Sequence, residues 1–217
     1  LDYSANELPA RFYAEQIDSI AAAIHNIENG SALIIGDQTG IGKGRIVAGL
    51  LRYAMRQGMT PVFVTEKPDL YGDMIRDLNG IGMPEMLGRD VNIFMTNQNV
   101  SVPLDEEALG WKSEFDAARE AGVKPPARRG KFLASRGKAA YESAMRAVTE
   151  GAEGAADMVF TTYDQMNTVK GEITDRRRFL DRIAPRALVI FDESHNAGGS
   201  GPADEKRKKA GAPPDRA

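Results

Sequence analysis

The stretch Gly36-Asp37-Gln38-Thr39-Gly40-Ile41-Gly42-Lys43-Gly44-Arg45 decides the fold. It follows a short apolar run, Ala32 to Ile35, and precedes apolar residues at helical spacing from Ile46 to Met55. Glycines in such a strand–turn–helix let backbone N–H groups approach an anion, and the helix N-terminus adds partial positive charge. Lys43 would then reach the β- and γ-phosphates of a nucleotide. We therefore predict a phosphate-binding loop over residues 36–45, against the alternative of a glycine turn that serves packing alone.

This loop departs from the general P-loop pattern at two positions. The first glycine of that pattern is Asp37 here, with Gly36 one position earlier. The final Ser or Thr, whose hydroxyl normally holds Mg²⁺, is Gly44. The preceding strand, the Thr-Gly-x-Gly-Lys core and the following helix nevertheless all agree with a phosphate loop.

Apolar strand-like runs separated by helical segments continue along the chain. Helical spacing is found over residues 12–29, 46–55, 68–78 and 176–184, and strand-like runs over 32–35, 61–65, 91–95, 158–162 and 187–191. Strands that are apolar throughout and alternate with helices are typical of a parallel sheet covered on both faces. The expected fold class is therefore α/β.

The composition fits one globular domain with an insertion and a tail. The chain has 217 residues, 42% of them hydrophobic and 27% charged, and a net charge of −3, which argues against a disordered or uniformly basic protein. The absence of cysteine excludes disulfides and thiolate zinc sites. Residues 97–156 exceed the length of a sheet crossover, so we predict a helical, basic insertion within a domain of residues 1–197. The glycine- and lysine-rich residues 198–217 predict a disordered tail.

Two adjacent carboxylates follow the last apolar strand, in Asp192-Glu193-Ser194-His195. The carboxyl ends of strands are where open α/β sheets place their ligands. In a nucleotide hydrolase Asp192 would hold Mg²⁺, usually through water, and Glu193 would orient and deprotonate the attacking water. We therefore predict an ATP and Mg²⁺ site, with a solvated acidic pair at a strand exit as the alternative. His195 is expected to couple this site to the rest of the protein, and otherwise is a surface histidine.

With these residues in view, the chain resembles the first RecA-like domain of a superfamily 2 helicase or translocase. More narrowly, GDQTGIGKGR followed by FDESHNAGG resembles the strawberry notch family, a grouping that extends to phage and plasmid antirestriction proteins with a helicase and a methylase. The resemblance implies a RecA-like P-loop sheet, a nucleic-acid partner (DNA rather than RNA) and a second RecA-like domain that supplies arginine fingers. It also implies a further strand between the phosphate-loop strand and the acidic strand. We therefore expect an incomplete sheet and a fragment that hydrolyses ATP slowly.

The resemblance assigns roles to residues outside the two nucleotide motifs. Gln16 matches the glutamine that reads the edge of adenine, although glutamine is also common on helix surfaces. Lys67, in Thr65-Glu66-Lys67, matches a motif that contacts the nucleic-acid backbone, as does Thr161-Thr162-Tyr163. The alternative for both motifs is ordinary capping of strand ends. The basic stretch Lys124 to Lys138 could extend the same track, or be a solvated loop.

Two rival functions stay open at this point. One is a small P-loop kinase, which would need an arginine-bearing lid, and the other is a nucleotide-fold scaffold or virion component without catalysis. No stretch approaches the ~20 apolar residues that span a bilayer, so no membrane partner is expected. We expect the protein in the cytoplasm, or in the nucleus or nucleoid, or carried in a phage particle.

Overall fold

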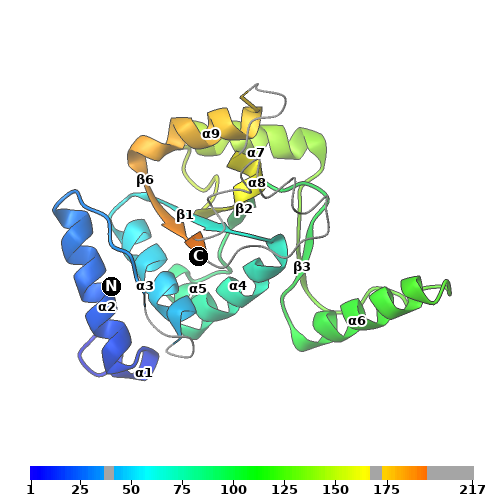
Figure 1. The fold of residues 1–217 in the computed structure, drawn as a ribbon, viewed down its shortest axis with the longest axis horizontal. Coiled ribbons are helices and arrows are strands. Elements are labelled where there is room, and N and C mark those ends of the chain that lie inside the picture. The colour runs from blue at the N-terminus through cyan, green and yellow to red at the C-terminus, as the bar shows by residue number, and fades with distance from the viewer. Residues whose placement is uncertain (37–41, 167–172, 195–217) are drawn as a thin grey trace, which may run out of the picture.

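A four-stranded parallel sheet forms the centre of the computed structural model, which describes residues 1–36, 42–166 and 173–194 (Figure 1). The strand order is β2-β5-β1-β6. The strands are β1 (Thr60–Thr65), β2 (Ile93–Met95), β5 (Met158–Thr162) and β6 (Ala187–Phe191). All three pairings are parallel, with Val62 opposite both Val159 and Val189. The predicted α/β fold is confirmed, and four of the five predicted strands form the sheet.

Helices cover both faces of this sheet because neighbouring residues of each strand point to opposite sides. On one face Phe63 and Phe160 form a core together with residues of helices α1 to α5. These are α1 (Leu8–Arg11), α2 (Ala14–Glu28), α3 (Lys43–Arg56), α4 (Tyr71–Gly80), which continues the 3₁₀ turn Pro68–Leu70, and α5 (Met83–Leu87).

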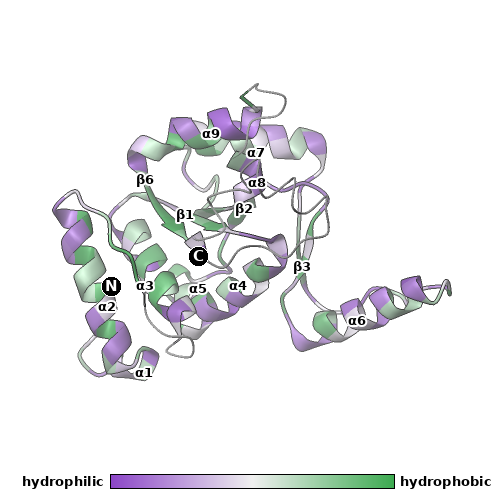
Figure 2. Ribbon diagram, viewed as in Figure 1, coloured by the Kyte–Doolittle hydropathy of each residue, from purple (hydrophilic) through white to green (hydrophobic). Residues whose placement is uncertain are grey.

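On the other face Val62 and Val64 pack with Phe94 beneath a second set of helices. These are α7 (Lys138–Glu150), α8 (Tyr163–Met166) and α9 (Asp175–Ile183), which leads into the 3₁₀ turn Ala184–Arg186. Figure 2 shows hydrophobic strands at the centre and a largely hydrophilic α9 outside them. No helix within the described ranges is long and apolar enough to cross a membrane.

The prediction of a strand over residues 32–35 is wrong. The segment has no strand assignment, and Ile34 is 90% exposed. Only Ile35 packs against the core of the first face. A strand needs a neighbour to supply its hydrogen bonds, and among the described residues β6 pairs with β1 alone. The segment forms no ladder with the other edge of β6, so it is not part of the sheet.

The predicted insertion divides into two parts in the structure. Residues 101–134 form a hairpin that projects from the body (Figure 1): β3 (Ser101–Pro103), α6 (Glu106–Glu120) and β4 (Phe132–Ala134), with β3 and β4 antiparallel. Trp111 packs edge-on against Phe132 and holds α6 to this hairpin. Helix α7, by contrast, belongs to the sheet's second face through Tyr141 and Val148. The predicted tail, residues 198–217, lies outside the described residues.

Candidate nucleotide site

Asp192 is held at the end of β6 by three hydrogen bonds, two through its backbone and one through its carboxylate. Its N–H donates to the carbonyl of Val64 at 2.8 Å and continues the ladder between β6 and β1. Its Oδ2 accepts from Thr65 Oγ1 at 3.4 Å, and its carbonyl accepts from Tyr163 Oη at 2.7 Å. Three strand ends thus determine where this side chain lies.

The pKa of Asp192 depends on its burial and on the charges around it, including that of Lys43. Burial is the main cause that raises the pKa of Asp192, and the neighbouring Glu193 raises it further. The hydrogen bond from Thr65 and the positive charge of Lys43 oppose this rise. Lys43 is the first residue of α3, so the start of that helix and the end of β6 lie near each other. The part of the phosphate loop over residues 37–41, and His195, lie outside the described residues.

Glu193 has a left-handed backbone conformation, with φ of 51°. Residues other than glycine rarely adopt this region, and such strain is concentrated at functional sites. The turn leaves the Glu193 side chain exposed directly beside the half-buried Asp192. The two acids therefore have different surroundings, as separate roles in metal binding and in water activation require.

Gln16 is buried against the phosphate loop rather than lying on an open helix surface. It is 2% exposed, its Oε1 accepts from the N–H of Tyr13 at 3.0 Å, and its Nε2 donates to the carbonyl of Gly42 at 3.3 Å. Gly42 itself is in the left-handed region, and a Cβ there would lie 2.5 Å from Gln16 Nε2. The amide thus connects the start of α2 to the turn that begins α3. That it reads adenine stays a prediction.

Close packing explains why the residue after Lys43 is glycine. A Cβ at Gly44 would lie 2.1 Å from Oδ2 of Asp77, a half-buried residue of α4 whose pKa is raised by that burial. Arg45 likewise lies against Gly80 and donates to the carbonyl of Arg11 at 2.8 Å. The hydroxyl side chain of the general P-loop therefore has no room at position 44 while Asp77 keeps this place.

We expect Gly44→Ser to lower the free energy of unfolding by about 1–2 kcal/mol, since overpacking is destabilising and Asp77 would have to turn away. Denaturant unfolding measures this change. Gly110→Ser is the matched control because a Cβ at Gly110 meets nothing within 4 Å. Asp77→Ala combined with Gly44→Ser should recover most of the loss, and a loss that persists in the double variant would contradict the role given to Asp77.

The donor set fits Mg²⁺ held together with phosphates rather than in a complete protein cage. Within the described ranges no three His, Asp or Glu side chains gather as a metal site. Mg²⁺ usually binds through one or two carboxylates, substrate phosphates and several waters. Asp192, beside Glu193 and Thr65, supplies such a partial set of hard oxygen ligands.

Replacing Asp192 should stabilise the protein without ligand. Because its folded pKa is raised, the native state loses stability as the pH rises from the ordinary carboxyl range through that pKa. We expect Asp192→Asn to raise the free energy of unfolding at pH 7 by a few tenths to about 1 kcal/mol, after allowance for solvent screening. The gain should shrink toward pH 3. Asp116→Asn, on the exposed side of α6, is the control. If the free energy of unfolding of Asp192→Asn equalled that of the wild type or fell below it, this account would be contradicted.

The predicted nucleic-acid residues lie in two different environments. Thr161 and Thr162 are buried, and their hydroxyls are bonded to Thr96 Oγ1 at 2.7 Å and to Asn97 Nδ2 at 3.1 Å. Tyr163 is buried on Asp192, as described above. Lys67, by contrast, is exposed after β1 and only 3.6 Å from Glu66. The first three side chains join strand ends, and of these four residues Lys67 is the cation exposed to solvent. The exposed cations Lys124, Arg128 and Lys138 belong to the predicted basic stretch.

Comparison with known proteins places the chain in a family. Residues 4–213 match the family described as P-loop containing NTP hydrolase pore-1, and the chain belongs to that family. Searches of curated proteins and of solved structures gave no match. The class is thus a P-loop NTP hydrolase with a parallel α/β sheet.

Proposed function

We propose that this chain is the ATP-binding motor domain, the first RecA-like half, of a DNA-dependent ATPase of strawberry notch type that works as a helicase or translocase. The observation that carries the proposal is the contact between α3, whose first residue is Lys43, and β6, which is followed directly by Asp192 and Glu193. A lysine and two carboxylates so arranged can bind a triphosphate, its metal and a water. The match to an NTP hydrolase family supports the same chemistry.

In this proposal the triphosphate lies over the N-terminus of α3, where the helix dipole and Lys43 favour negative charge. Asp192 would hold Mg²⁺, which neutralises charge on the β- and γ-phosphates when bound. The oxygen of the attacking water bonds to the γ-phosphorus, and Glu193 accepts a proton from that water. The bond from that phosphorus to the β,γ-bridging oxygen breaks, and ADP leaves.

Among the described residues β6 pairs with β1 alone, and its other edge supports a further strand in the working motor. Beyond its pairing with β1, β6 leaves Val189 36% and Phe191 48% exposed. An apolar groove of about 210 Å³ runs beside them, between Val64 of the sheet and Leu180 of α9. Parallel sheets are normally covered on both faces, and free edges favour pairing with other chains. We propose that another strand pairs here and that a second RecA-like domain supplies the arginine finger.

The function is tested with the 217-residue chain and single-stranded DNA. We expect weak binding of ATP–Mg²⁺, measured with a fluorescent nucleotide, and very slow phosphate release. An arginine finger contributes on the order of 10³–10⁵ in rate in related phosphoryl transfer, so closure against a second domain is needed for fast turnover. Failure to bind nucleotide would overturn the ATP site. DNA-stimulated turnover by this chain alone at the rates of complete helicases would overturn the dependence on a second domain.

A further inference from the structure

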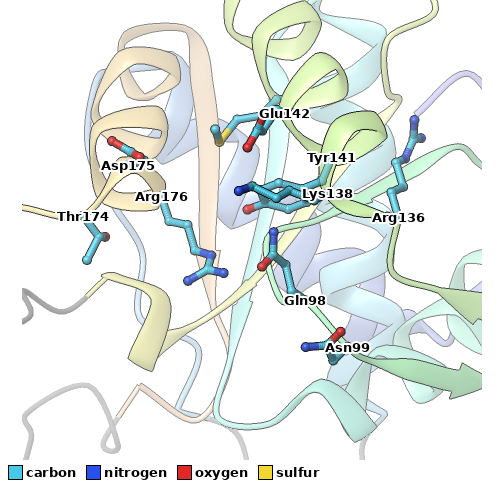
Figure 3. A pocket seen from close by; sticks show the side chains of 11 residues that line it. Gln98, Asn99, Arg136, Lys138, Tyr141, Glu142, Thr174, Asp175 and Arg176 are labelled. Atoms are coloured by element: carbon cyan, nitrogen blue, oxygen red, sulfur yellow. The ribbon is translucent and has the colours of Figure 1, made fainter.

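A second cavity, of about 440 Å³, lies beyond the end of β2, at the opposite edge of the sheet from β6 (Figure 3). Its walls come from three separate segments: Gln98 and Asn99 after β2, the first two turns of α7, and the first turn of α9. Ligand sites typically measure about 300–1,000 Å³, so the cavity has room for one unit of a polymer rather than a single ion. None of the described residues of the predicted nucleotide site lines it.

Two cations enter this cavity from facing helices. Lys138 lies on α7, and Arg176 reaches from α9 into the space that faces Gln98 (Figure 3). A third, Arg136, is at the rim and donates to Asn92 Oδ1 at 3.1 Å. Of the two acids in the lining, Asp175 accepts from Arg178 at 2.9 Å, and Glu142 lies one turn after Lys138. The balance of charge is positive, which favours an anion.

Among the described residues, one buried nitrogen of Arg176 lacks a protein acceptor, although the same side chain is hydrogen-bonded to Tyr141. Nε of Arg176 is buried and has no hydrogen-bond partner within the described part of the chain. Buried donors of this kind are rare and normally have a partner in the complete assembly. The N-cap of α7 is Gly137, with no side-chain cap and no acid in the first turn, so no side chain there offsets the positive end of this helix. Both features indicate an oxyanion ligand.

The aromatic side chain of the wall is not placed to stack with a base. Tyr141 is buried, and its hydroxyl donates to the carbonyl of Thr96 at 2.9 Å. The ligand is therefore held by charge and by polar groups, as sequence-independent phosphate contacts are.

The cavity also begins directly after Thr96 and Asn97, which are hydrogen-bonded to the end of β5. Strand β5 lies between β2 and β1, the strand that Lys67 follows.

We propose that this cavity binds the phosphate backbone of a single nucleic-acid strand, and that Lys138 and Arg176 contact the phosphates. The strand runs from Lys67 across the ends of β1, β5 and β2 into the cavity. This inference rests on the proposed nucleic-acid-dependent motor. The sequence indicated such a role for the basic stretch that ends at Lys138, and the structure adds Arg176 of α9.

The test is binding of a fluorescein-labelled oligothymidine by the 217-residue chain, measured by anisotropy over a range of NaCl concentrations. We expect Lys138→Gln with Arg176→Gln to weaken binding about tenfold and to reduce the slope of log K against log salt by about 1.4, near 0.7 for each contact. Arg146→Gln on α7 and Arg182→Gln on α9 are the matched controls, since both side chains are exposed and outside the cavity. Circular dichroism verifies that each variant folds.

The outcomes separate this proposal from the motor function. Nucleotide binding should be unchanged in the cavity variants, and Lys43→Ala should still bind the oligonucleotide. An unchanged affinity and salt slope in the double variant would overturn the proposal while leaving the ATP site intact. Absence of oligonucleotide binding by the wild-type chain would also overturn it. Inorganic phosphate or a mononucleotide is then added as a competitor. If either competes with an affinity far higher than that of the oligonucleotide, the proposal is overturned in favour of a small phosphorylated ligand.

Discussion

Replacing Glu193 by glutamine should lower the rate of ATP hydrolysis by about 10²–10⁴-fold, the usual contribution of a positioned general base. The amide keeps the size of the side chain and its left-handed turn but cannot take the proton of the attacking water. Binding of ATP–Mg²⁺ should stay within about twofold, because Glu193 acts on the water rather than on the phosphates. Single-turnover assays with excess protein give the rate, and a fluorescent nucleotide gives the affinity.

Glu66→Gln is the matched control for this experiment. Glu66 is an exposed glutamate at the end of the neighbouring strand β1, and its side chain lies by Lys67. Its replacement should leave hydrolysis unchanged. Equal rates for Glu193→Gln and the wild type would exclude Glu193 as the base, and equal losses in both variants would point to a general effect of charge at this edge.

Lys43→Ala should weaken the binding of ATP–Mg²⁺ by about tenfold to a hundredfold. A hydrogen bond to a charged group contributes about 1.5–3 kcal/mol, and Lys43 brings its charge to the phosphates at the start of α3. The affinity is measured by titration with a fluorescent nucleotide. The loss should appear for ATP and ADP more than for AMP, because Lys43 is expected at the β- and γ-phosphates.

Lys67→Ala provides the reciprocal comparison. It removes an exposed cation from the same edge of the sheet, but from the end of β1 rather than from the start of α3. Nucleotide affinity should be unaffected, while oligonucleotide affinity and its salt dependence should fall. If both lysine variants changed the same ligand's affinity equally, the separation of the nucleotide site from the nucleic-acid track would be wrong.

Most of the fold could be predicted because its strands and helices have clear sequence periods. The runs over 158–162 and 187–191 match β5 and β6 residue for residue, because a largely apolar run is typical of a strand in a parallel sheet. The run over 32–35 is equally apolar, but its state depends on a neighbouring strand rather than on its own residues. Local sequence does not contain that information.

The residues that shape the site were harder to predict because tertiary contacts define them. Asp77 is one of several polar residues on α4, and only the packing of α4 against α3 places it at Gly44. The buried pairs Thr96–Thr161 and Asn97–Thr162 depend on the register of β2 and β5. The cavity between α7 and α9 joins segments some 75 residues apart, from Gln98 to Thr174. Adjacent residues of one motif, such as Asp192 and Glu193, can be predicted as candidates without such information.

A double-mutant cycle on ATP–Mg²⁺ binding with Lys43→Ala and Asp192→Ala tests most directly whether these two groups meet at one triphosphate. Groups that share a ligand are coupled, so the two losses in binding free energy should fail to add by about 0.5–3 kcal/mol. Losses that add to within about 0.3–0.5 kcal/mol would mean that Lys43 and Asp192 act independently, and would contradict a single site between α3 and β6.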